Sequence, residues 1–373
     1  MIDQPPAALR WDIFCRVIDN FGDAGVCWRL AADLASRGEL VRLYIDQPEI
    51  LAGLTGKSLP ASSVSIHHWP EDHQSFAPDD LADVVIEAFA CDPPSAYVLA
   101  MSDTDRKIAW INLEYLSAEK WVETHHLVAS PNPRHALTKY FYFPGFTPGT
   151  GGLLREPGLI EKLKKLEAAH PSTGTSHLRL FLFSYQQPAL ECWLDTLNAN
   201  GTIGTLSVAP CPAEDQIEKW MKAGNAQKQV KVEKLAFVAQ EEFDAVLSGY
   251  DWLFVRGEDS FVRAQWAGKP LVWHIYPQDE DTHLLKLRAF YDLYLDQGVL
   301  TALQRSIYWQ FVLVWNNADP SNTSPEKLAD LWPQLASIYP ALLENAHVWR
   351  SRLIRQPDLV SQLRDFVSHL VKC

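Results

Sequence analysis

Short apolar runs alternate with longer amphipathic stretches along most of this chain. In the first half, the apolar runs are brief and bounded by polar residues, which is typical of strands in a parallel sheet. The predicted strands are residues 13–18, 41–45, 83–87 and 107–111. Between the first two, Val26, Leu30 and Leu34 recur at helical spacing and predict a helix over residues 25–37.

The same alternation of strands and helices continues in the second half of the chain. The predicted elements are strands at residues 178–183, 205–208, 231–235, 252–255 and 271–275, and helices at 191–198 and 240–247. Because strands and helices alternate in both halves, the pattern predicts an α/β protein with two parallel-sheet domains.

A polar segment, HPSTGT at residues 170–175, separates the two halves. It follows a charged helical stretch at 159–169 and is the best linker candidate. We therefore expect an N-terminal domain over residues 1–175 and a C-terminal domain over 176–345. The tail keeps helical periodicity, and we expect a helix at about residues 346–373 to pack back on the first domain.

Length and composition agree with this organisation and narrow the class of protein. The 373 residues exceed what one hydrophobic core usually serves. A net charge of -13 argues against broad binding to nucleic acid or to an acidic membrane, and favours a basic partner or an ordinary soluble enzyme.

The six cysteines lie far apart without a C-x-x-C pair, which favours reduced thiols. The chain shows neither a signal peptide nor an apolar run long enough for a membrane, so we expect a cytoplasmic protein.

Two carboxylates follow the first predicted strand, in the segment DNFGDAG at residues 19–25. Ligands of open α/β sheets bind outside the carboxyl ends of the strands, so Asp19 and Asp23 are candidates for a cleft. An ionised carboxylate there could bind a cation or accept its proton. The alternative is structural: Asp19 starts a turn, Gly22 permits a tight bend and Asp23 is the helix N-cap. Spacing alone leaves both interpretations open.

A second polar cluster, RGEDS at residues 256–260, joins a predicted strand to a short helix. The N–H groups that open such a helix stabilise negative charge, and Arg256 adds a full positive charge. The cluster also carries Glu258 and Asp259, which predicts a site for a phosphorylated ligand and a further group. The alternative is capping of the helix by Asp259 or Ser260, with an arginine–carboxylate pair nearby.

Several familiar chemical motifs are absent. No G-x-G-x-x-G or G-x-S-x-G occurs, and the segment GLTGKS at residues 53–58 is too short for a phosphate-binding P-loop. The histidine pairs His67-His68 and His125-His126 lack the spacing of metal ligands, so we expect no metal site. Cys27 lies among apolar neighbours and is expected to pack rather than to react.

Seven segments of the chain form a distinctive set of motifs: DNFGD (19–23), EAFACD (87–92), LEYLSAE (113–119), GGLLRE (151–156), RGEDSFVRAQ (256–265), AGKP (267–270) and WHIYPQD (273–279). Together they closely resemble the motifs of the EarP family, bacterial protein-arginine rhamnosyltransferases that act on elongation factor P. The resemblance covers residues from about 11 to 295.

This resemblance implies a GT-B fold, in which two Rossmann-like domains face each other across a cleft. It implies dTDP-β-L-rhamnose as donor, bound mainly by the second domain, and one arginine of elongation factor P as acceptor. Transfer would invert the anomeric centre without a metal or other cofactor. The expected partners are therefore this protein acceptor and a nucleotide sugar, with no direct role for nucleic acid or membrane.

The resemblance also implies roles for individual residues. Asp23 would be the general base, Asp19 its partner in holding the acceptor, and Glu258 would stabilise the positively charged transition state. The donor would be bound by Asn20, Phe21, Gly22, Tyr185, Phe237, Gln240, Arg256, Asp259, Ser260 and Tyr276. Of these, Phe237 and Gln240 would hold the thymine, with Tyr185 stacking on its other face. The sequence departs from the family at Ala239, where proline is common, and around Tyr185, where a glycine is missing.

The implied chemistry suits these residue types. A guanidinium is a poor nucleophile because its lone pair is delocalised, and carboxylates can orient it and take a proton as the bond forms. Two other hypotheses remain open at this stage: a non-catalytic GT-B-like module that binds its ligands without transfer, and a GT-B enzyme with a small-molecule acceptor. The intact set of Asp19, Asp23, Arg256 and Glu258 argues against a non-catalytic module.

Overall fold

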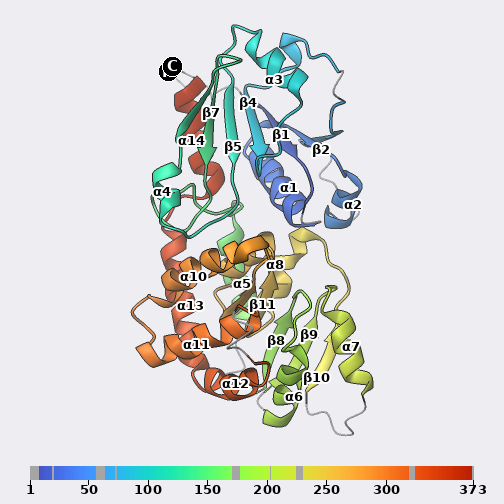
Figure 1. Ribbon diagram of the computed structural model, residues 1–373, viewed down its shortest axis with the longest axis vertical. Helices are drawn as coiled ribbons and strands as arrows, with labels where there is room; N and C mark the ends of the chain where they lie inside the picture. Colours follow the sequence, from blue (N-terminus) through green and yellow to red (C-terminus); the bar gives the residue numbers. More distant parts are fainter. Residues whose placement is uncertain are drawn as a thin grey trace. The chain divides into compact units, whose positions relative to one another are not determined.

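A computed structural model describes residues 8–18, 21–55, 64–71, 74–169, 177–201, 203–223, 230–318 and 324–371. The chain divides into two compact units (Figure 1). The first comprises Met1–Pro157 and Gln356–Cys373, and the second comprises Gly158–Arg355. Each unit is built on its own sheet and has its own core.

The first unit contains a seven-stranded sheet in the order β3-β2-β1-β4-β5-β7-β6. All neighbouring strands are parallel except β6 and β7, which are antiparallel. The strands are β1 (Arg10–Cys15), β2 (Leu40–Ile45), β3 (Val64–His68), β4 (Val84–Ala88), β5 (Ala109–Leu113), β6 (Ala129–Asn132) and β7 (Leu137–Tyr142). The helices are α1 (Phe21–Ser36), α2 (Glu49–Thr55), η1 (Pro78–Asp80), α3 (Ser95–Ser102), α4 (Trp121–His125) and α14 (Leu359–Val371).

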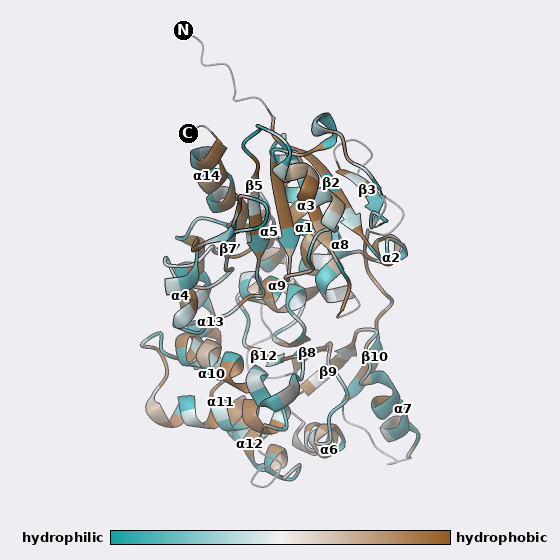
Figure 2. Cartoon of the chain, turned by 45° about the horizontal axis from the view of Figure 1, so that its top comes forward, coloured by the Kyte–Doolittle hydropathy of each residue, from teal (hydrophilic) through white to brown (hydrophobic). Residues whose placement is uncertain are grey.

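Alternate residues of each central strand face opposite sides of this sheet. In β1, Trp11, Ile13 and Cys15 belong to one apolar cluster, whereas Phe14 belongs to the other. The first cluster includes residues of α1 and α14, and the second includes residues of α3. Because both faces are covered, the central strands are mostly hydrophobic along their length (Figure 2).

The strand β1 begins earlier than its apolar run predicts, and it ends earlier as well. The predicted strand covered residues 13–18, but pairing with β2 starts at Arg10 and ends at Cys15. The polar Asp12 can lie in the strand because its buried carboxylate accepts hydrogen bonds from Arg42, at 2.6 Å, and from Tyr97, at 2.5 Å. Tertiary hydrogen bonds thus stabilise a buried carboxylate that the sequence pattern predicts to lie outside the strand.

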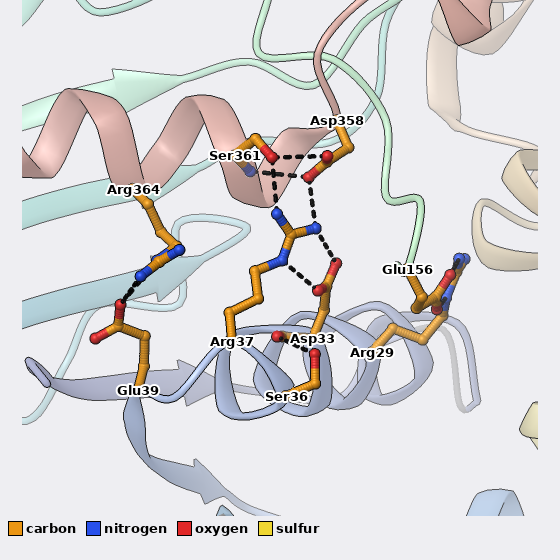
Figure 3. A network of polar contacts seen from close by, with 9 residues as sticks. All are labelled: Arg29, Asp33, Ser36, Arg37, Glu39, Glu156, Asp358, Ser361 and Arg364. Carbon is orange, nitrogen blue, oxygen red and sulfur yellow. Dashed lines mark hydrogen bonds and ion pairs between the residues drawn. The ribbon is translucent and has the colours of Figure 1, made fainter. Parts of the chain in front are cut away.

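The C-terminal helix α14 is fastened to α1 by apolar and polar contacts. Its buried residues Leu359, Val360, Leu363 and Val367 join the core cluster of the first unit. Arg37, at the C-terminal end of α1, pairs with Asp33 at 2.7 Å and with Asp358 at 2.8 Å (Figure 3). This network holds the helix that carries Asp23 against the end of the chain.

The tail forms two helices rather than one continuous helix over residues 346–373. The helix α13 (Tyr339–Ile354) ends before Pro357, and α14 begins after it. Proline lacks the N–H that a continuing helix needs, which explains the break. Only α14 lies in the first unit, because α13 packs on α9 and α10 of the second.

The second unit is built on a five-stranded parallel sheet in the order β10-β9-β8-β11-β12. The strands are β8 (Leu178–Leu182), β9 (Ile203–Val208), β10 (Lys231–Lys234), β11 (Trp252–Arg256) and β12 (Leu271–His274). The helices are α5 (Leu159–Ala169), α6 (Leu190–Asn200), α7 (Glu214–Lys222), α8 (Gln240–Ser248), α9 (Asp259–Ala267), η2 (Asp279–Asp281), α10 (Thr282–Leu295), α11 (Ala302–Trp315), α12 (Lys327–Ser337) and α13. Fully buried tryptophans fill much of its core, among them Trp193, Trp252, Trp315 and Trp332.

The division between the units falls earlier than the predicted boundary at residue 175. The helix α5 matches its predicted range, but it is grouped with the second unit. It packs on α8 and α9, and Lys162 Nζ donates to the Glu241 carbonyl of α8 at 3.1 Å, while Glu167 pairs with Arg350 of α13. The predicted linker at 170–175 lies outside the described residues. None of the described helices is long and apolar enough to cross a membrane.

Candidate active site

The strand order of each sheet reverses beside its first strand. In the first unit the reversal lies between β1 and β4, and in the second between β8 and β11. In open α/β sheets, the crevice outside the carboxyl ends of these strands is the usual ligand site. The polar clusters that the sequence predicts lie at these two sheet edges.

In the first unit, Asp23 lies in the first turn of α1 and is 3% exposed. Its Oδ2 accepts the N–H of Ile18 at 2.9 Å, and its Oδ1 accepts the hydroxyl of Tyr115 at 3.3 Å. Because α1 begins at Phe21, Asp23 is inside the helix, so its interpretation as the N-cap is wrong. The positive end of the helix and these two donors therefore lie around the carboxylate.

The other candidates in this segment are placed only in part. Phe21 and Gly22 open α1, so their backbone lies at the same helix end as Asp23. Asp19 and Asn20 lie outside the described residues. Their predicted roles therefore stay predictions.

A strained turn after β4 supports this edge of the first sheet. Phe89, Ala90 and Asp92 adopt left-handed backbone conformations, with φ of 57°, 54° and 50°. Such conformations cost about 1–3 kcal/mol each for residues other than glycine, and they concentrate at functional sites. The ring of Phe89 stacks on Tyr115 with centroids 4.2 Å apart, so the turn also positions the tyrosine that contacts Asp23.

Sequence reasoning did not single out Tyr115 as a functional residue. It follows β5, which pairs with β4, which in turn pairs with β1. The sequence feature that could have identified Tyr115 is its position in the segment LEYLSAE, just after a strand. Only the order of strands shows that this segment reaches the helix that carries Asp23.

In the second unit, Arg256 ends β11, and its guanidinium lies between two aromatic rings. The Cζ atom is 4.8 Å from the centroid of Phe183 and 4.6 Å from that of Tyr185. Its Nε is buried and has no hydrogen-bond partner among the described residues. The geometry holds the guanidinium in a fixed place by cation–π contacts and leaves a donor for an incoming group.

The helix that follows, α9, begins without a side-chain cap. Gly257 has φ of 65°, which only glycine adopts readily, and Glu258 occupies the N-cap position. Ser260 donates its hydroxyl to the Arg256 carbonyl, and Asp259 accepts from Gln240 Nε2 at 2.8 Å. The interpretation that Asp259 or Ser260 caps the helix is therefore wrong. The first N–H groups of α9 are not capped by these side chains and lie beside Arg256.

The remaining donor-site candidates lie at the same end of the second sheet. Tyr185 follows β8, and its ring contacts Tyr276 edge-on at 5.8 Å and His274 edge-on at 5.1 Å. Phe237 and Tyr276 are large exposed aromatic residues, at 52% and 45% exposure. Exposed rings at a sheet edge are suited to stacking on a planar or sugar ligand.

The buried His274 beside Tyr185 gives the protein a defined sensitivity to acid. Burial lowers the pKa of His274 to about 3, and Arg256 and His283 act in the same direction. Below about pH 6.5, the unfolded chain binds a proton on this histidine that the folded protein excludes. Stability that is present above pH 6.5 is therefore lost as the pH falls towards 3.

Between pH 7 and pH 5, we expect the free energy of unfolding of the wild-type protein to fall by about 2 kcal/mol more than that of His274→Gln. Urea titrations at the two pH values measure the difference. His369→Gln, at an exposed position on α14, is the control and should keep the wild-type slope. Equal slopes for wild type and His274→Gln would contradict this assignment.

No group of three or more histidine, cysteine or acidic side chains is placed to hold a metal ion anywhere in the described part of the chain. His67 instead packs its ring against Tyr44, and its Nε2 lies 3.1 Å from Ser65 Oγ. Cys27 is fully buried, as expected for a packing residue, and the neighbouring Cys15 raises its pKa together with burial. These residues do not form a further chemical site.

Comparison with known proteins identifies the family of this chain. A family model described as elongation factor P (EF-P) rhamnosyltransferase EarP matches residues 11–368. A protein-arginine rhamnosyltransferase of Pseudomonas aeruginosa is 38% identical, over 95% of this chain and 98% of that protein. One from Neisseria meningitidis is 35% identical, over 97% of this chain and 98% of that protein.

Solved structures extend the comparison to the fold. A structure described as the basis of EarP-mediated arginine glycosylation of EF-P is 27% identical, covers 97% of this chain and 99% of that one, and has a TM-score of 0.64. The glycosyltransferase of kitacinnamycin, at 14% identity and a TM-score of 0.55 over 98% of this chain and all of that one, shares the fold alone. The α/β architecture with two sheets is that of the GT-B glycosyltransferases. With a family model matching nearly its whole length, the chain belongs to the EarP family of EF-P rhamnosyltransferases.

Proposed function

We propose that this protein transfers L-rhamnose from dTDP-β-L-rhamnose to one arginine side chain of translation elongation factor P, with inversion at the anomeric carbon. The observation that carries the proposal is the family match over residues 11–368, which spans both polar sheet edges. The first unit provides the acceptor site and the second the donor site. The reaction takes place in the cytoplasm, where translation occurs.

On the donor side, Arg256 and the first N–H groups of α9 bind the diphosphate. The buried Nε of Arg256 has no protein partner among the described residues, and a phosphate oxygen would satisfy it. Ser260 and Tyr276 lie around the same strand ends and contact the diphosphate and sugar. Phe237 and Gln240 hold the thymine, and Tyr185 lines the site beside Arg256.

On the acceptor side, Asp23 is the general base, with Asp19 as its partner. An acceptor guanidinium has a pKa above about 12, so it reacts only if a base removes a proton as the new bond forms. The hydrogen bonds from Ile18 and Tyr115 hold both carboxylate oxygens of Asp23 in place. This fixed carboxylate can pair with the guanidinium, orient one nitrogen and accept its proton.

The reaction is a single displacement. An arginine nitrogen forms a bond to the anomeric carbon as the bond from that carbon to the diphosphate breaks. The proton goes to Asp23, and dTDP leaves with its charge stabilised by Arg256. Glu258, at the start of α9, supplies negative charge for the oxocarbenium-like transition state. This mechanism requires no metal.

The decisive test is the intact mass of elongation factor P after incubation with this protein and dTDP-rhamnose. We expect a gain of one deoxyhexose, lost when the acceptor arginine of elongation factor P is replaced by lysine, and retained in EDTA. Binding of both ligands without any mass change would instead identify a non-catalytic module. A gain on the lysine variant would contradict the assignment of the acceptor.

A further inference from the structure

Four polar side chains form a connected network between the neighbouring helices α8 and α9. Arg263, near the middle of α9, donates from Nη1 to Asp244 at 2.5 Å and from Nε to Asp259 at 3.3 Å. The same Oδ2 atom of Asp259 accepts the amide Nε2 of Gln240 at 2.8 Å. The network thus runs from the interior of the unit to a residue of the donor site.

The burial of this network makes each member depend on the others. Arg263 is 3% exposed, Asp244 4% and Gln240 8%. A buried carboxylate or guanidinium is tolerated only when it is paired and hydrogen-bonded. The planar fork of arginine reaches two carboxylates at once, whereas the ammonium group of a lysine at this position has no such fork.

The network determines which way the amide of Gln240 points. The Oδ2 atom of Asp259 already accepts the Nε–H of Arg263, and the amide of Gln240 presents its N–H group to the same acceptor oxygen. If the amide turned over, its carbonyl oxygen would face a carboxylate oxygen at a partly buried contact. The carbonyl oxygen Oε1 of Gln240, with its two lone pairs, therefore points away from Asp259.

We propose that Arg263 is a positioning residue that, through Asp259, sets the amide orientation of Gln240 and so makes the donor site select a base with an N3–H group over cytosine. The inference rests on the proposed function, in which Gln240 holds the thymine. Thymine and uracil carry a donor at N3, which a carbonyl oxygen accepts. Cytosine carries an unprotonated N3 whose lone pair faces the same oxygen unfavourably. Arg263 therefore contributes to the choice of base without touching the base itself.

Another buried ion pair of the same unit offers a matched comparison. Arg179 pairs with the fully buried Asp251 at 3.0 Å. These residues lie at the amino ends of β8 and β11, the edge opposite to the donor site. Loss of Arg179 should lower stability much as loss of Arg263 does, but without any effect on the orientation of Gln240.

The test is the binding of free nucleotides to the full chain by calorimetry. dUDP and dCDP differ only at N3 and C4 of the base, so the ratio of their dissociation constants isolates this contact. We expect the wild-type protein to bind dUDP at least about tenfold more tightly than dCDP, as one well-placed hydrogen bond allows. In Arg263→Lys and in Asp259→Asn the ratio should fall towards one, whereas Arg179→Met should keep the wild-type ratio.

Thermal unfolding of each variant shows whether it is folded at the temperature of the titration, and Arg263→Lys and Asp259→Asn provide two routes to the same answer. A wild-type ratio in both folded variants, or a wild-type protein that does not discriminate dUDP from dCDP, would overturn the role of Arg263. If the ratio fell equally in Arg179→Met, loss of any buried ion pair in this unit would explain the effect, and the specific role of Arg263 would again be overturned. If the wild-type protein bound neither dTDP nor dUDP, the proposed donor itself would fail.

Discussion

Replacing Asp23 by asparagine is expected to lower kcat for rhamnosylation by about 10²- to 10⁴-fold, the range for loss of a general base. The amide has nearly the size of the carboxylate and can still accept the N–H of Ile18. It cannot take a proton from a guanidinium, and it gives no charge to pair with one. The loss should therefore appear in kcat more than in stability, and steady-state kinetics with elongation factor P as acceptor measure it.

A matched control for this variant lies in the same helix. Asp33→Asn makes the same chemical change at a buried carboxylate of α1, but there it weakens the ion pair with Arg37 that fastens α14 (Figure 3). We expect a lower melting temperature with kcat close to that of the wild-type protein. If Asp23→Asn kept kcat within a few-fold of wild type, Asp23 would not be the base.

Replacing Arg256 by alanine is expected to lower kcat by about 10²- to 10³-fold, because one preorganised donor at the leaving group is lost. The affinity for dTDP should fall as well, since the diphosphate loses a charge-assisted hydrogen bond. Arg256→Lys restores a positive charge but cannot lie flat between Phe183 and Tyr185, so its activity should be intermediate. Kinetics at varied dTDP-rhamnose, with calorimetry of dTDP, separate the two effects.

Arg288→Ala provides the control for loss of an arginine held over an aromatic ring. Its guanidinium lies 4.9 Å from the ring centroid of Trp309 on the surface of the second unit. This variant should keep wild-type kcat and dTDP affinity. Unchanged dTDP binding in Arg256→Ala would remove Arg256 from the donor site, whatever the effect on kcat.

Much of the fold follows from local periodicity, and the errors have identifiable causes. The helix α5 was predicted with its observed bounds, because a stretch of alternating charge ends at the polar segment 170–175. By contrast, β1 starts at Arg10 because Asp12 is satisfied by Arg42 and Tyr97, a contact that the strand pattern does not encode. The strands β3, β6 and β7 were not predicted, since they are mostly half-buried or exposed and lack a continuous buried apolar run.

The candidate site shows the same division between local and distant information. Arg256 and Asp23 could be selected because each follows a predicted strand at the start of a helix. Their surroundings could not be predicted in the same way. The alternatives of an Asp23 N-cap and of capping by Asp259 or Ser260 were excluded only once the first residues of α1 and α9 were known.

By itself, the sequence determined the alternation of strands and helices, the presence of two parallel sheets and the polar segments at the strand ends, because periodicity and turn chemistry act over a few residues. The tertiary structure alone decided that Tyr115 reaches Asp23, that Arg256 lies against the rings of Phe183 and Tyr185, and that Arg263 and Gln240 both donate to Asp259. These contacts join residues far apart along the chain, or in different helices. They form only when strand order and helix packing bring their elements together, which no local pattern records.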